Sequence, residues 1–185
     1  MIRATVRTLL MVCFLASPLA ANPIGTASGT GVIERQVASP QAGGGPETEK
    51  VPFAPRFAFA YRDTGGDRNT WLVLTEKQPP VAEWLAAGDR AEARRLWCQR
   101  EQASFVAAEI NAEGGVELYF LCPGNGSVNT EMVSTSNGLA SVAVTFERRD
   151  DARLKGTLRG GDGWCGEGVY CETTENYAFD APLAR

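Results

Sequence analysis

The sequence predicts a mainly β protein, either an antiparallel β-sandwich or a curled sheet, with one helical excursion at about residues 80–100 and disulfides that staple the fold. Short runs of alternating apolar residues, rich in aromatic and β-branched side chains, recur between residues 56 and 180 with turn residues between them. The stretch 80–100 instead carries mostly Ala, Glu, Arg, Leu and Trp, which favour or tolerate a helix. Four of the five cysteines follow the N-terminal segment, an even number that suits two disulfides.

The N-terminal end carries a targeting pattern. Arg3 and Arg7 precede a short apolar run, 8–19, that ends near small residues, as in a secretory signal peptide. This run is shorter than the roughly 20 apolar residues that span a bilayer. We therefore expect a signal peptide over 1–21, cleaved after Ala20 or Ala21 or else retained as an anchor. The protein should be periplasmic or secreted, with no membrane insertion once the signal is cleaved.

Two further segments are expected after the signal. Residues 22–50 are rich in Gly, Ala, Ser, Thr and Pro and hold few large apolar side chains. Such a composition buries too little surface to offset the entropy of ordering, so it predicts a flexible linker. Residues 51–185 then form a single globular β-rich domain.

The expected strands follow one another with short turns. Phe57, Phe59 and Tyr61 lie two residues apart, which places them on one face of a strand. The Gly-containing loops 63–68 and 111–115 indicate hairpins, and Asn137-Gly138 is the strongest turn signal in the chain. The strands are expected at 56–62, 69–75, 105–110, 116–122, 141–147, 153–159 and 172–180.

The helical stretch is expected in two pieces divided by Gly88. Asp89 precedes the second piece as its N-cap, with Glu92 three residues later in the spacing of a capping box. Its apolar face would include Ala93, Leu96 and Trp97 against the sheet. A basic run on the same helix is interleaved with acids and predicts a solvated, salt-bridged face; it consists of Arg90, Arg94, Arg95 and Arg100.

Charge and composition exclude several function classes. The chain holds 18 basic and 22 acidic residues and no histidine. Loss of Arg3 and Arg7 with the signal would leave 16 basic residues and a net charge of -6. An acidic chain without a basic patch predicts no nucleic-acid partner and favours a protein partner with a basic surface. The absence of histidine excludes Ser-His and Cys-His nucleophiles and HExxH zinc sites.

The cysteines are interpreted as disulfides. Of three possible connectivities we favour Cys98–Cys122 and Cys165–Cys171, because each pair joins segments close in sequence. A four-thiolate zinc site is the alternative, but the chain contains no CxxC pair. We expect no metal and no cofactor.

The loop 160–171 is the strongest candidate for a partner-binding site. Its five glycines and two cysteines surround Trp164 and Tyr170, and rigid aromatic side chains on loops are typical binding anchors. Asp162 and Glu167 lie beside them in this loop. The structural alternative is that Trp164 folds back over the end of the sheet.

Other polar groups in the sequence fit simple turns. The loop 122–130 and the set Asp63, Asp67 and Asn69 are explained by turns and a hairpin connection. Carboxylate pairs can act without histidine, and candidates on or beside the expected strands are Glu109, Glu117, Glu131 and Glu147. No feature of the sequence selects a pair among them.

These observations predict an exported, non-catalytic protein-binding module. It could be an inhibitor or immunity-type protein that neutralises a toxin or hydrolase in the cell envelope. One alternative is an envelope enzyme that acts on glycan through paired carboxylates. Another is a structural envelope protein tethered by an uncleaved signal.

Overall fold

A computed structural model describes residues 23–37, 47–63, 69–124, 129–132, 142–160 and 175–184. Within these residues the protein is mainly β, with two helices between the fourth and fifth strands. The helices are α1 (Val81–Ala86) and α2 (Arg90–Glu101). The strands are β1 (Gly25–Val37), β2 (Glu47–Phe53), β3 (Phe57–Arg62), β4 (Thr70–Thr75), β5 (Phe105–Ile110), β6 (Val116–Cys122), β7 (Asn129–Met132), β8 (Val142–Arg149), β9 (Arg153–Gly160) and β10 (Glu175–Ala184).

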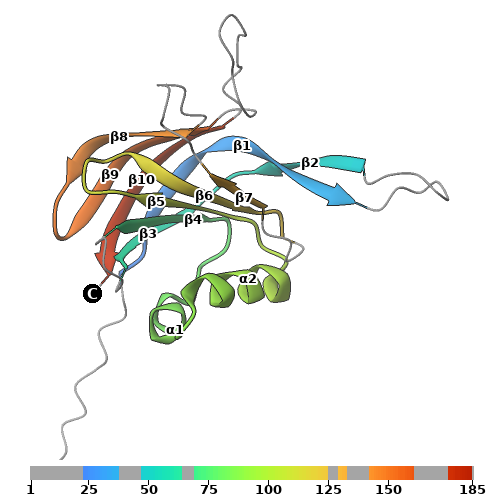
Figure 1. The fold of residues 1–185 in the computed structure, drawn as a ribbon, viewed down its shortest axis with the longest axis horizontal. Coiled ribbons are helices and arrows are strands. Elements are labelled where there is room, and N and C mark those ends of the chain that lie inside the picture. The colour runs from blue at the N-terminus through green and yellow to red at the C-terminus, as the bar shows by residue number, and fades with distance from the viewer. Residues whose placement is uncertain are drawn as a thin grey trace, which may run out of the picture.

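The strands form one strongly curled sheet. Its order is β7-β6-β5-β4-β3-β1-β10-β9-β8, and β2 extends it as a hairpin partner of β1. Neighbouring strands are antiparallel, and an additional short parallel pairing joins β3 to β10. Figure 1 shows the sheet curving over itself while both helices lie on one side of it, beneath β3–β6. The predicted fold class is therefore confirmed, in its curled-sheet form.

The predicted elements from residue 56 onward correspond closely to those observed. β3 and β4 form the expected hairpin, closed by a bond from the Asp63 amide to the Asn69 carbonyl, and β5 and β6 form the next one. The helical stretch divides at 87–89, as Gly88 predicts. Asp89 caps α2 by accepting a hydrogen bond from the Glu92 amide at 2.9 Å. The Asn137-Gly138 turn lies outside the described residues.

The linker prediction for 22–50 is wrong where β1 and β2 lie. β1 pairs with β10, β2 and β3, so it is an integral part of the sheet. Its small residues allow close approach rather than disorder. A Cβ at Gly25 would collide with the Asp180 carbonyl, and one at Gly31 with the Tyr177 hydroxyl. The buried Ile33 then anchors the strand in the core.

A strand also occupies part of the expected turn-rich loop 122–130. β7 pairs with β6 between Leu118 and Leu121 and forms an edge of the sheet. Its polar residues have weak β-propensity and therefore gave no strand signal in the sequence. The strand forms because it pairs with β6.

The sheet has two buried faces. The inner face of the curl encloses an apolar cluster that includes Ile33, Leu72 and Leu158. The outer face of β3–β6 packs against the helices through a second, aromatic cluster that includes Phe59, Trp84 and Trp97. Trp84 and Trp97 contact each other edge to face, with ring centroids 5.1 Å apart. Among the described residues no helix is both long and apolar enough to cross a membrane.

The predicted apolar face of α2 is wrong at Leu96, which is 49% exposed. The inward face instead carries Arg94, Trp97 and Cys98, which are all buried. Positions three and four apart share a helix face, so an inward Trp97 and Cys98 bring Arg94 inward as well. Leu96 is consequently turned towards solvent.

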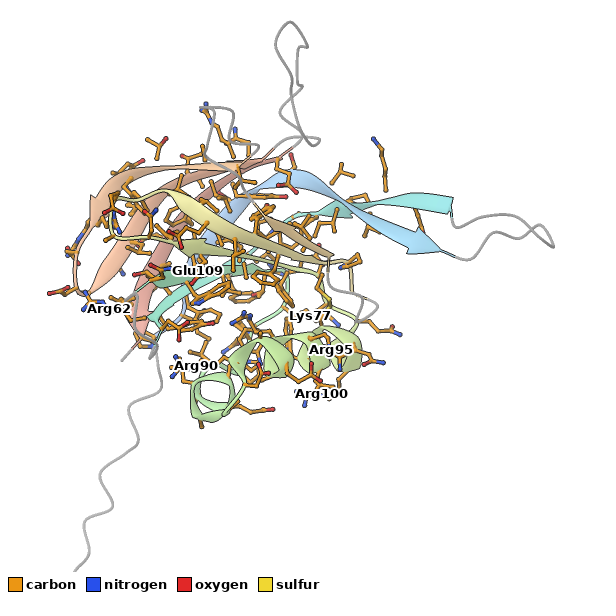
Figure 2. The ribbon with its side chains drawn as sticks, viewed as in Figure 1. Arg62, Lys77, Arg90, Arg95, Arg100 and Glu109 are labelled. Carbon is orange, nitrogen blue, oxygen red and sulfur yellow. A yellow bond between two sulfur atoms is a disulfide. The ribbon has the colours of Figure 1, made fainter. Side chains whose placement is uncertain are left out.

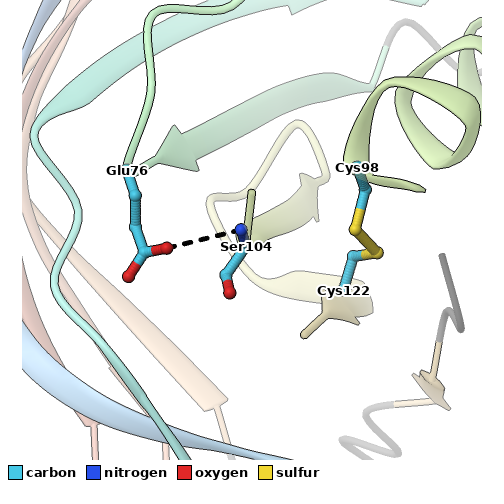
Figure 3. The surroundings of a disulfide bond; sticks show 4 residues. All are labelled: Glu76, Cys98, Ser104 and Cys122. Carbon is cyan, nitrogen blue, oxygen red and sulfur yellow. Dashed lines mark hydrogen bonds between the residues drawn. A yellow bond between two sulfur atoms is a disulfide. The ribbon is translucent and has the colours of Figure 1, made fainter. Parts of the chain in front are cut away.

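A disulfide joins the C-terminal part of α2 to the end of β6. Cys98 and Cys122 are bonded, with Cα atoms 6.6 Å apart, as predicted (Figure 3). Nearby, the Glu76 carboxylate accepts hydrogen bonds from the Ser104 amide at 3.4 Å and the Ala54 amide at 3.3 Å. These contacts fix the segments on either side of the helical excursion. Cys165 and Cys171 lie outside the described residues.

Candidate functional site

The predicted binding loop is not covered by the structure. Trp164, Tyr170, Asp162 and Glu167 all lie outside the described residues, so their role stays a prediction. The described part of the chain offers a different candidate, a hollow between the helices and the edge of β3 and β4.

This hollow, which we call the arginine hollow, has a volume of about 470 Å³. Its lining combines cationic, acidic and aromatic side chains with the segment between the helices: Tyr61, Asp63, Trp71, Ala87, Gly88, Asp89, Arg90, Ala91 and Arg94. A second hollow of about 480 Å³ shares Tyr61, Asp63 and Arg90 with it and adds Leu85 and Leu183. Arg90 therefore belongs to the lining of both.

Arg94 is the most unusual residue of the arginine hollow. It is only 2% exposed, although it carries a full charge. Its Nη1 donates a hydrogen bond to the Tyr61 hydroxyl, and its Cζ lies 4.8 Å from the centroid of the Trp71 ring. Its Nε is buried without a hydrogen-bond partner. Within the part of the chain that the structure describes, the guanidinium is thus held by aromatic side chains rather than by an ion pair.

Arg90 lies one turn earlier on α2 and is half-buried. Its Cζ lies 5.1 Å from the centroid of the Tyr61 ring. Its terminal nitrogens donate to the carbonyl oxygens of Arg62 and Leu85 at 3.2 and 3.4 Å. Figure 2 shows Arg90 near the start of α2, with Arg62 on the neighbouring end of the sheet. The guanidinium thereby joins both helices to β3.

Burial dominates the electrostatics of the Tyr61–Arg94 pair. Burial raises the pKa of the Tyr61 phenol, although the positive charge of Arg94 opposes the shift. Burial likewise lowers the pKa of the Arg94 guanidinium, and the hydroxyl of Tyr61 and the charges of Asp89 and Asp63 oppose this. The guanidinium remains protonated at neutral pH, because free arginine has a pKa above about 12.

The prediction of a solvated basic face on α2 is correct only in part. Arg95 pairs with Glu92 at 2.6 Å and Arg100 pairs with Glu101 at 2.9 Å, both exposed to solvent. Arg94 is not part of the solvated face, because the helix face that buries Trp97 buries Arg94 as well. The spacing of Arg94 from Trp97 and Cys98 was the available sequence signal.

A second polar cluster brings together two of the four candidate carboxylates. The Asn69 side chain, 7% exposed, donates from Nδ2 to Glu109 at 3.1 Å and to Glu117 at 2.9 Å. Asn111 donates to the other oxygen of Glu117 at 3.2 Å. The register of the β5–β6 pairing shifts beside Glu109, and Glu117 lies at this shift, between the paired residues Val116 and Leu118. Because both accepting oxygens lie near the same nitrogen, they are within about 6 Å of each other.

The other two candidate carboxylates do not join this pair. Glu147 is on β8, where it pairs with Lys155 at 2.6 Å. The side chain of Glu131 is not described. In the described part of the chain no group of three or more acidic or cysteine side chains is placed to hold a metal ion.

Comparison of this chain with family models, with curated proteins and with solved structures found no match. The arginine hollow and the Glu109–Glu117 cluster are therefore the features from which a function can be inferred.

Proposed function

We propose that this protein is an exported, non-catalytic binding module that holds a protein partner at the arginine hollow. The signal-peptide pattern at the N-terminus supports export, and the Cys98–Cys122 disulfide suits an oxidising compartment. An inhibitor or immunity-type role in the cell envelope is consistent with this arrangement. The acidic composition favours a partner whose surface is mainly basic.

The observation that carries the proposal is the lining of the hollow. Tyr, Trp and Arg are the residue types most enriched among the energetically dominant residues of protein interfaces. Here Tyr61, Trp71 and Arg94 are buried and in contact with one another, and the half-buried Arg90 lies against the Tyr61 ring. They are positioned by the sheet and by a capped helix, so little side-chain entropy remains to be lost on binding. The volume of about 470 Å³ suits an inserted side chain.

Site-specific photo-crosslinking tests the proposal. A photoreactive residue replaces Ala91, which is exposed and lines the hollow, and in a control variant it replaces Gln99, which is exposed on α2 outside the lining. We expect one envelope or secreted protein to be crosslinked from position 91 and not from position 99. The identified partner, once purified, should bind at least tenfold more weakly to the Arg90→Glu variant and normally to Arg95→Glu. Absence of a specific adduct, or equal loss in both variants, would contradict the proposal.

A second candidate function is hydrolysis of glycan by the Glu109–Glu117 pair. Retaining glycosidases place two carboxyl groups about 5–5.5 Å apart, a spacing that the shared contact with Asn69 permits. Against this candidate, Asn69 and Asn111 already occupy oxygens of both carboxylates. We therefore rank it below the binding function.

The test of the glycan candidate is release of dye from labelled peptidoglycan. Activity that falls at least 100-fold in both Glu109→Gln and Glu117→Gln would establish it. Glu147→Gln is the matched control, since Glu147 is a strand glutamate whose partner is Lys155. No release by the unmodified protein would eliminate the candidate.

A further inference from the structure

We infer that the arginine hollow binds a single carboxylate, supplied by an aspartate or glutamate side chain of the protein partner. In this complex the carboxylate pairs with the Arg90 guanidinium and compensates the charge of Arg94. The inference rests on the proposed binding function and specifies the group that the site recognises.

Within the described residues Arg94 has no carboxylate at ion-pair distance, although Asp63 and Asp89 line the same hollow. Among the described residues no carboxylate oxygen lies within 4.0 Å of its guanidinium, and its Nε has no acceptor. A buried charge without a paired counter-ion costs several kcal/mol. Buried ionisable groups with strongly perturbed environments cluster at functional sites, so the surroundings of Arg94 are a candidate place for a ligand to supply an anion.

The arginines of α2 differ in their partners along the helix. Arg95 and Arg100 lie further along the helix, where each has a glutamate within 3 Å. Arg90 and Arg94 line the hollow, and within the described structure neither has an acidic partner at ion-pair distance. Among the described residues Arg90 donates to two backbone carbonyls and lies against the Tyr61 ring, so its charge is also available for pairing.

The lining favours a monoanion over a phosphate. Asp63 and Asp89 belong to the same lining as the two arginines, so its formal charges cancel. Both aspartates repel a dianion more strongly than a monoanion, so the lining favours one carboxylate beside Arg90. The start of α2 offers no alternative anion site, because the Asp89 side chain already accepts the Glu92 amide there.

The surroundings favour a side chain of a protein over a free acid. The neighbouring hollow shares Arg90 and adds the apolar residues Leu85 and Leu183 together with the ion pair of Arg62 and Asp151. A polypeptide can place a carboxylate beside Arg90 while its adjacent residues cover these apolar groups. A small free acid would leave Leu85, which is half-buried in the structure, without such a cover.

Binding of small probes, followed by NMR on the purified oxidised protein, tests the inference. The side-chain Nε–Hε resonances of Arg90 and Arg94 are monitored at constant ionic strength. The probes are N-acetyl-glutamate α-methylamide, its neutral glutamine counterpart and inorganic phosphate. We expect saturable shifts with the glutamate probe alone, weakened at least fivefold by Arg90→Gln and unchanged by Arg95→Gln. Equal response to phosphate, or no saturation by the glutamate probe, would overturn the inference.

The NMR titration and the crosslinking experiment together separate this inference from the proposed function. A partner crosslinked at position 91 together with no binding of the glutamate probe would refute the carboxylate and leave the binding function standing. Saturable binding of the glutamate probe together with no crosslinked partner would refute the protein-binding function and identify a free acid as the ligand. When both succeed, replacing the partner's acidic residue by its amide should abolish the difference between the unmodified protein and Arg90→Gln.

Discussion

Arg94 donates a hydrogen bond to the hydroxyl of Tyr61, and both side chains are buried between α2 and the outer face of the sheet. The pair joins a helix to β3, 33 positions earlier in the chain. The Trp71 ring on β4 contacts the same guanidinium. One cation therefore connects the helical layer to two strands, and it does so beside the hollow that we propose as the binding site.

Loss of the Tyr61 hydroxyl should destabilise the protein. Tyr61→Phe leaves a buried guanidinium donor without its acceptor, a defect that costs about 1–3 kcal/mol of unfolding free energy. Urea unfolding at neutral pH measures the change.

The double variant Tyr61→Phe/Arg94→Met is the control for that prediction. Replacing both partners by apolar groups removes the buried charge together with its unmet hydrogen bond, which is often neutral or stabilising. The double variant should therefore be at least as stable as Tyr61→Phe alone. The single variant Arg94→Met completes the comparison. If the double variant lost as much unfolding free energy as the two single variants added together, Tyr61 and Arg94 would not be coupled.

The Cys98–Cys122 disulfide should contribute measurably to stability. The two cysteines are 24 positions apart, and closure of a loop of that length in the unfolded chain is worth about 3.5 kcal/mol in the loop-entropy model. Cys98→Ser/Cys122→Ser should lower the unfolding free energy by a comparable amount. Reductant should destabilise the unmodified protein by breaking this disulfide. The variant lacks the disulfide and should not show that loss. Equal unfolding midpoints for the variant and the oxidised protein would contradict the prediction.

Periodicity predicted the strands that alternate, and it failed where strand formation depends on distant partners. The two-residue spacing of Phe57, Phe59 and Tyr61 is enough to predict β3. β1 carries glycines and small polar residues, and its strand state follows from pairing with β10 and β2. Gly25 and Gly31 are needed there because another part of the chain approaches too closely for a side chain. Composition alone cannot show such an approach.

Most of the candidate site could not be predicted from the sequence, because it also depends on how distant segments pack. An arginine in a run with Asp and Glu fits a solvated face, and Arg95 and Arg100 fulfil that expectation. Whether Arg94 is solvated depends on how α2 is rotated against the sheet, which is set by burial of Trp97 and Cys98. Glu109 and Glu117 likewise meet at the Asn69 side chain beside a local register shift in β5–β6, and the sequence pattern does not reveal that shift.

The β8–β9 turn should lose stability in acid through Asp150. The Asp150 carboxylate accepts the amides of Ala152 and Arg153 at 2.9 Å and the Nε of Arg148 at 2.6 Å. The hydrogen bond from Ala152, followed by that from Arg148, lowers the pKa of Asp150 in the folded state. A lowered pKa means that its stabilisation is complete above the unfolded value, about 3.9, and is lost as the pH falls through the folded value.

Two substitutions at this turn separate charge from geometry. Asp150→Asn keeps an oxygen that can accept the two amides and cannot titrate. Its unfolding midpoint should therefore fall less steeply than that of the unmodified protein in the acid range. Asp150→Ala removes the acceptor altogether and should be the least stable of the three at neutral pH. Parallel acid profiles for Asp150→Asn and the unmodified protein would refute the assignment.

Two glycine substitutions should have opposite effects on stability. A Cβ at Gly156, buried in β9, would collide with the backbone carbonyl of Thr145 in β8, so Gly156→Ala should cost about 1–3 kcal/mol as the strands separate. Gly88, between the helices, has no atom within 4 Å of the position of an added Cβ and does not adopt a positive φ. Gly88→Ala should therefore stabilise the protein by about 0.4–1 kcal/mol, because it restricts the unfolded chain. Urea unfolding of both variants checks the pair, and a neutral Gly156→Ala would show that β8 and β9 do not approach as closely as the fold requires.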